Sequence, residues 1–228
     1  MIEGLEQVIK LDNVDKFKEF IWDKAKDILF NKDYNLLHYA ISKQAVGIVE
    51  FILKTDYYDI NEQTNDKYTA LTLAMSEYNK AAEEIVEMIF KYYPDVDVDI
   101  PNKYGRNAVL VGLMSGISNR YILMAAEKTK NLEQLDTDMN ETVVKACLRD
   151  VGMYRMHAQV LALYIRKGAK IDRDDIYKIM ILSPSKEHNS VWDAIDGRKE
   201  FDETVSELAI EKGCDNFLPD TVKDIFIF

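Results

Sequence analysis

Four segments of the chain share one six-residue pattern, and they recur at nearly constant spacing. They are 35–40 (NLLHYA), 69–74 (TALTLA), 107–112 (NAVLVG) and 141–146 (ETVVKA), and the steps between their first residues are 34, 38 and 34. A period of this size is typical of a solenoid, in which each unit buries its apolar face only against its neighbours. The chain is therefore expected to fold as stacked repeats, which present an extended surface more readily than a closed pocket.

Each hexamer is predicted to begin a short helix, because a polar stretch that favours a turn comes directly before it. Asn35 and Thr69 are residues that cap helices well. A second apolar segment then follows in each unit, at 48–53, 85–90, 121–124 and 160–165. In the first two of these segments the apolar residues have the spacing of a buried helix. The repeating unit is thus a turn, a helix, a short connection and a second helix.

These residues resemble the ankyrin repeat, whose first helix opens with Thr-Pro-Leu-His-x-Ala. The first hexamer keeps the Leu, His and Ala of that motif, and the second keeps Thr, Leu and Ala. Gly105 matches the family's turn glycine and Gly116 the glycine between its helices, while 164–172 (YIRKGAKID) is similar to its helix-end signature. No hexamer has the proline of the motif. Paired-helix repeats of the HEAT or tetratricopeptide kind are the rival fold, and the recurrent turn residues favour ankyrin.

The resemblance implies an all-α ankyrin-repeat solenoid of about six helix-turn-helix units, with short turn or hairpin tips and atypical terminal repeats. We expect a single domain over 1–228. Its parts are an N-terminal cap at 1–30, repeats at 31–64, 65–102, 103–136 and 137–172, and a divergent last repeat with a C-terminal cap at 173–228, which carries an insertion around 183–198.

Composition narrows the class of protein. Hydrophobic residues make up 47% of the chain and charged residues 30%, which is globular composition. The formal net charge of −11 and the lack of a cluster rich in Lys and Arg argue against nucleic-acid binding. No apolar run reaches transmembrane length, so no membrane association is expected. The start of the chain has no conventional signal peptide, and two cysteines are too few for a disulfide framework. These features favour the cytoplasm, or delivery into a host cytoplasm without such a signal.

The residues that could carry chemistry are better explained as structural. His38 is expected to hydrogen-bond the backbone of a neighbouring turn, as the resemblance implies, and Cys147 to be buried and inert. His157, His188 and Cys214 have no partners at catalytic or metal-ligand spacing. The segment 95–99 (DVDVD) lacks the glycine and distant glutamate of a calcium loop and is predicted to be an extended linker with Val96 and Val98 turned inward. No catalytic residue, metal site or cofactor is predicted, and the protein is not expected to be an enzyme.

The predicted binding site is the concave face implied by the resemblance. Tyr34, Tyr68, Arg106 and Asn140 hold the place just before each hexamer, and Tyr and Arg are common interface anchors. The alternative is that the tyrosines pack against one another along the stack. The complete set of predicted partner-binding residues adds neighbouring tip residues and the exposed side of the first helices: Lys32, Tyr34, Lys43, Asp66, Tyr68, Glu77, Tyr104, Arg106, Asn140 and Arg149.

The resulting hypothesis is a protein–protein interaction module, monomeric when free, whose acidity favours a partner with a basic surface. An inhibitor, an immunity-type neutraliser, a scaffold and a delivered effector are narrower roles that the sequence does not separate. The alternative is an enzyme or small-molecule sensor that uses the divergent region 173–228, with a pocket near Trp192 and His188.

Overall fold

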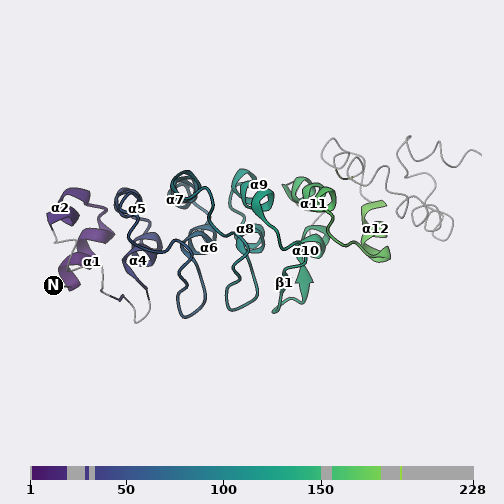
Figure 1. Cartoon of the computed structure of the whole chain (residues 1–228), viewed down its shortest axis with the longest axis horizontal. Coiled ribbons are helices and arrows are strands. Elements are labelled where there is room, and N and C mark those ends of the chain that lie inside the picture. Colours follow the sequence, from purple (N-terminus) through teal and green to yellow (C-terminus); the bar gives the residue numbers. More distant parts are fainter. Residues whose placement is uncertain (1, 20–28, 31–33, 150–155, 181–190, 192–228) are drawn as a thin grey trace, which may run out of the picture. The chain divides into compact units, whose positions relative to one another are not determined.

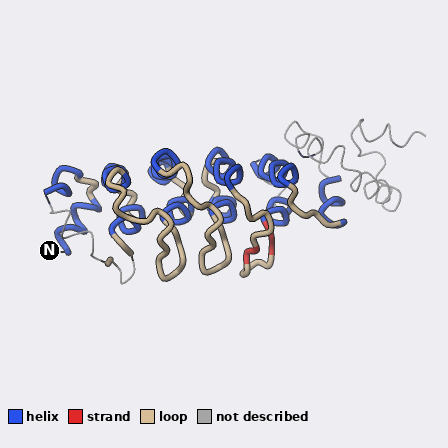
Figure 2. Tube along the Cα trace, viewed as in Figure 1, coloured by secondary structure: helices blue, strands red, loops and turns tan. Residues whose placement is uncertain are grey.

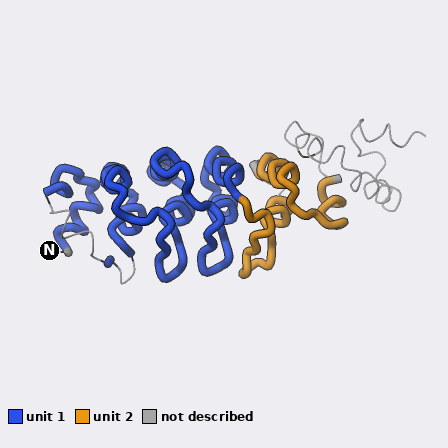
Figure 3. Tube along the Cα trace, in the orientation of Figure 1, with its two compact units in different colours: residues 1–129 blue, residues 130–228 orange. Residues whose placement is uncertain are grey.

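The described part of this computed structural model comprises residues 2–19, 29–30, 34–149, 156–180 and 191. Its elements are almost all helices, with one short two-stranded hairpin, which confirms the all-α prediction (Figure 1). The chain divides into two compact units, residues 1–129 and residues 130–228 (Figure 3). No helix among the described residues is long and apolar enough to cross a membrane.

The first unit begins with two helices, α1 (Ile2–Lys10) and α2 (Val14–Glu19). They lie within the segment 1–30, which the sequence predicts to be an N-terminal cap. Leu5, Ile9 and Phe17 are buried, and α2 packs against α5 (Val46–Leu53) of the next repeat. The Asp12 carboxylate accepts hydrogen bonds from the N–H groups of Gly47 and Ile48 at 2.8 and 2.9 Å. The first N–H groups of a helix have no acceptor within the helix, so the Asp12 carboxylate satisfies two of them at the start of α5.

Three helix pairs follow in the described part of the first unit. The first helices are α4 (Leu36–Ser42), α6 (Ala70–Met75) and α8 (Ala108–Ser115), and the second helices are α5, α7 (Lys80–Tyr92) and α9 (Asn119–Lys128). Each first helix packs against its own second helix and against the neighbouring first helices. The first helices form one row and the second helices another, and the loops that lead into α6 and α8 project from the far side of the first row (Figures 1 and 2).

The first three hexamers begin helices as predicted. The Asn35 side chain accepts from the His38 N–H at 2.9 Å, the Thr69 side chain from the Thr72 N–H at 3.2 Å and the Asn107 side chain from the Leu110 N–H at 3.1 Å. Each hexamer thus contributes the N-cap and then the buried face of a first helix. Gly116 ends α8 in the left-handed conformation, with φ at +75°, which is the place predicted for the glycine between the helices.

The second unit contains a short hairpin of β1 (Leu135–Asp136) and β2 (Glu141–Thr142), followed by α10 (Val143–Arg149), α11 (Met156–Lys167) and α12 (Arg173–Met180). The strands are antiparallel, with Leu135 opposite Thr142 and Asp136 opposite Glu141. The side chain of Thr142 accepts from the Lys145 N–H. In this unit the helix therefore starts one residue later, relative to the hexamer, than in the first three repeats.

Candidate functional site

The tips of the first unit are closed by backbone and buried side-chain contacts. Phe30 and Tyr34 exchange two backbone hydrogen bonds, of 2.6 and 2.8 Å. In the next tip the Thr64 N–H donates to the Tyr68 carbonyl at 2.9 Å, and the Tyr68 N–H donates to the Thr64 hydroxyl at 3.1 Å. These bonds fix the residue before each hexamer at the base of its tip.

The third tip is closed around a buried asparagine. The Asn102 N–H donates to the Arg106 carbonyl at 2.9 Å, and the Asn102 side chain accepts from the N–H groups of Tyr104 and Arg106 at 2.9 and 3.1 Å. Gly105 has a φ of +77°, and Lys67, the equivalent residue of the tip before it, has a φ of +60°. The turn requires this conformation, which glycine adopts without strain. Gly105 is therefore the turn glycine that the sequence indicates.

Neighbouring tips are also joined to each other. The Lys103 N–H donates to the Asp66 carbonyl at 3.0 Å, and the Lys103 ammonium lies 2.8 Å from the Asp66 carboxylate. The Gln63 side chain bridges to the Pro101 carbonyl at 3.0 Å. The hydrogen bond to Asp66 raises the pKa of Lys103 above its usual value. Lys103 was not among the binding residues predicted from the sequence. The available signal was that its charge is opposite to that of Asp66 in the neighbouring tip.

The predicted tip residues of the first unit lie at the surface. Tyr34, Tyr68, Tyr104 and Arg106 are half-buried and Asp66 is exposed. The Lys103 ammonium and the Arg106 guanidinium lie 5.0 and 4.9 Å from the centre of the Tyr104 ring, within the range of a cation–π interaction. The Tyr34 ring lies 6.1 Å from the ring of His38. We use the name tip surface for the six residues Tyr34, Asp66, Tyr68, Lys103, Tyr104 and Arg106.

Two further predicted residues lie just after the first helices. Lys43 follows α4 and is half-buried, and its ammonium lies 5.1 Å from the centre of the Tyr39 ring. Glu77 follows α6 and is exposed. Lys32 lies outside the described residues.

The fourth tip differs from the predicted register. Asp136 pairs with Glu141, so Glu141 takes the place that Tyr34, Tyr68 and Arg106 have in the first unit. Asn140 has a φ of +53° and corresponds instead to Lys67 and Gly105. One extra residue in this turn causes the shift. Asn140 and Arg149 are both exposed, and Arg149 forms an ion pair with Glu141.

The residues assigned structural roles behave as expected where they are described. The His38 ring Nε2 lies 3.2 Å from the Glu62 carbonyl, in the turn that leads to the next tip, which confirms its predicted hydrogen bond. Cys147 is fully buried, and His157 is buried near the start of α11. Val96 and Val98 are buried as predicted. No group of three His, Cys, Asp or Glu side chains in the described part of the chain is arranged to hold a metal ion.

Trp192, His188 and Cys214 lie outside the described residues, as does the insertion around 183–198 apart from Val191. The tip surface is therefore the predicted site whose residues the structure describes. It presents aromatic rings, cations and a carboxylate on turns that are joined by a hydrogen bond and an ion pair. Such a surface suits contact with another macromolecule rather than the enclosure of a small substrate.

Comparison with known proteins supports the fold. A family model described as ankyrin repeats (3 copies) matches residues 5–102. No curated protein matches the chain in sequence. An ankyrin repeat domain from Acinetobacter baumannii AYE is similar in structure, with a TM-score of 0.64 and 15% sequence identity; the match covers 85% of this chain and 96% of that one. EF0377, an ankyrin repeat protein, gives a TM-score of 0.60 at 17% identity and covers 87% of this chain and 99% of its own.

Proposed function

We propose that this chain, whose residues 5–102 belong to the ankyrin-repeat family, binds a partner protein through the tip surface of its first unit. Ankyrin repeats are in general protein–protein interaction modules. The observation that supports this site is the joining of two neighbouring tips through Asp66 and Lys103, with aromatic and cationic side chains beside the joint. Residues of these types, held on ordered turns, are the usual anchors of an interface.

The tip surface carries both signs of charge, because Lys103 and Arg106 lie with Asp66. Its rings and cations provide directed contacts, while Lys43 and Glu77 lie beyond the other ends of α4 and α6. An inhibitory, immunity-type, scaffolding or effector role would each use such a surface. The cytoplasm remains the proposed location, in keeping with two cysteines of which Cys147 is a buried free thiol.

The proposal is tested by replacing two tip rings. Tyr34→Ala combined with Tyr68→Ala should abolish capture of the native partner from lysate, since large aromatic truncations at an interface centre remove its main anchors. The fold should persist, because backbone bonds and Thr64 close these tips, not the two rings. Capture is followed by mass spectrometry, and folding by circular dichroism and thermal melting.

Tyr177→Ala provides a matched control. Tyr177 is also half-buried but lies on helix α12 and not on a tip, so this variant should capture the partner as the wild type does. Full capture by the folded Tyr34/Tyr68 double variant would refute the tip surface as the binding site.

A further inference from the structure

The Gln63 side chain bridges two neighbouring tips of the first unit through a single amide group. Its nitrogen donates to the Lys67 carbonyl at 2.7 Å, on the returning side of its own tip, and to the Pro101 carbonyl at 3.0 Å, at the start of the next tip. Both partners are carbonyl oxygens, which can only accept, so the NH₂ group of the amide faces them. The loops that carry these residues lead into α6 and α8 and lie side by side (Figure 2).

The two carbonyls that Gln63 holds come directly before residues that form or anchor the tip surface. The first belongs to the peptide that leads into Tyr68, and the second to the peptide that leads into Asn102. Asn102 in turn accepts from the N–H groups of Tyr104 and Arg106. Because a peptide unit is planar, a held carbonyl sets the direction in which the next residue continues. One amide thus relates Tyr68 in the second tip to Tyr104 and Arg106 in the third.

Both acceptors belong to residues with a restricted backbone. Lys67 has a φ of +60°, a left-handed conformation that is unfavourable for a residue other than glycine. The hydrogen bond from Gln63 to its carbonyl helps to hold that conformation. The ring of Pro101 fixes its own φ. Gln63 therefore connects two points whose positions vary little within each tip.

The bridge belongs to this pair of tips and adds little to the packing of the stack. At the same place in the other repeats stand Leu29, Pro101 and Leu135, which have no side-chain donor. The helices α6 and α8 already pack against each other, whereas Gln63 is exposed. Exposed hydrogen bonds contribute little to the net stability of a fold, because water replaces them. The effect of the bridge is therefore local, on the spacing of the two tips.

We propose that Gln63 is a positioning residue of the binding site, which holds Tyr68 in a fixed relation to Tyr104 and Arg106 so that a partner protein contacts both tips at once. This inference rests on the proposed function, since it assigns a role within the tip surface. Gln63 acts through the backbone of the two tips and not by touching the partner. Tips that are already held in the bound arrangement lose less conformational freedom on binding, which raises the affinity.

The first test needs no partner and measures amide hydrogen exchange by NMR in the ¹⁵N-labelled full chain. Gln63→Met keeps the length of the side chain but has no donor. In this variant the Lys103 N–H, which donates to the Asp66 carbonyl, should exchange about tenfold faster, because exchange reports the local opening of the joined tips. The amides of α6 and α8 and the melting temperature should stay unchanged.

Two further variants make this test specific. Gln63→Lys again places donors within reach of both carbonyls and should restore slow exchange of the Lys103 N–H. Gln7→Met makes the same change at an exposed glutamine of α1, away from the tips, and should behave like the wild type. Unchanged exchange of the Lys103 N–H in Gln63→Met would overturn the proposal. An equal rise in the exchange of α6 and α8 would also overturn it, because Gln63 would then support the whole stack.

The second test uses the protein that the wild-type chain captures from lysate, purified and titrated by calorimetry. Gln63→Met should raise its Kd about fivefold or more, since the tips have to be ordered on binding, and Gln63→Lys should restore it. Wild-type affinity in Gln63→Met, despite faster exchange, would overturn the positioning role. Failure of the tip surface itself has a different sign, namely full capture by the folded variant that combines Tyr34→Ala with Tyr68→Ala.

Discussion

In the first unit, the helix that opens each repeat is buried, whereas the tip just before it lies at the surface. Leu36, Leu71 and Val109, at the starts of α4, α6 and α8, have no exposed surface, while Asp66 is exposed and Tyr68 half-buried. The two regions are neighbours in sequence within every repeat. The hexamers thus supply the packing between repeats, and the tips form the surface that we propose for partner binding.

The largest effect is expected from the buried helices. Leu71→Ala removes a fully buried side chain from α6, which packs against α4, α7 and α8. The free energy of unfolding should fall by about 2–5 kcal/mol, because the surrounding helices cannot close the cavity completely. Urea unfolding followed by circular dichroism measures the loss. Leu73→Ala, at a half-buried position of the same helix, should lower the free energy of unfolding clearly less. Equal losses in the two variants would contradict the assignment of the packing to the buried face.

An intermediate effect is expected where a tip has a buried anchor. Asn102→Ala removes the acceptor of the Tyr104 and Arg106 N–H groups, so the free energy of unfolding should fall by about 1–2 kcal/mol. Asn102→Asp keeps the acceptor oxygen and should recover most of this loss. The buried Asp136 already accepts from the N–H groups of Asp138 and Met139 in the second unit's turn. If Asn102→Ala and Asn102→Asp lowered the free energy of unfolding equally, the acceptor oxygen would not be what stabilises this tip.

The smallest effect is expected from the ion pair between tips. Asp66→Asn removes its charge, yet the midpoint of urea unfolding should stay within experimental error, because exposed ion pairs contribute little. The backbone hydrogen bond from Lys103 to Asp66 does not depend on that side chain. A shifted midpoint in low salt that disappears in high salt would show instead that tip electrostatics support the stack.

The sequence predicted the repeating elements well, because apolar spacing and capping residues act locally. Asn35 and Thr69 predict the helices that follow them, because their side chains cap helix starts. Val96 and Val98 alternate with polar residues, as expected of a linker with one buried face. The fourth unit was misaligned by one residue, since a constant period does not reveal an extra residue inside a turn. Thr142, a good N-cap, was the available signal for the correct register.

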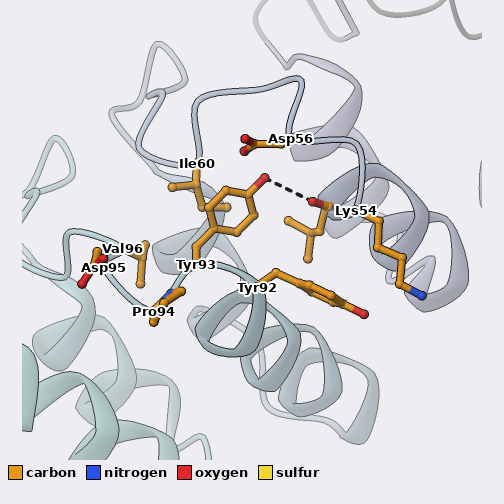
Figure 4. A pocket seen from close by; sticks show the side chains of 9 residues that line it. Lys54, Asp56, Ile60, Tyr92, Tyr93, Pro94, Asp95 and Val96 are labelled. Atoms are coloured by element: carbon orange, nitrogen blue, oxygen red, sulfur yellow. Dashed lines mark hydrogen bonds between the residues drawn. The ribbon is translucent and has the colours of Figure 1, made fainter.

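Contacts between repeats were harder to foresee. The ion pair between Asp66 and Lys103 joins residues that are 37 apart in sequence. A hollow lined by Ile60, Tyr93 and Val96 depends on how the end of α5 faces the end of α7 (Figure 4). Nothing in the local pattern of Tyr92, Tyr93 and Pro94 distinguishes a hollow from an ordinary helix end. Such features follow from the offset between stacked helices, which the period alone does not specify.

The bond between the Lys103 amide and the Asp66 carbonyl has a consequence for the kinetics of association. Two adjacent turns that are already locked together lose little conformational entropy when a ligand docks on them. A partner that contacts both turns should therefore bind in a single concentration-dependent phase, without a slow ordering step after encounter. The spacing of these turns is then a fixed length that the partner's own contact points have to match.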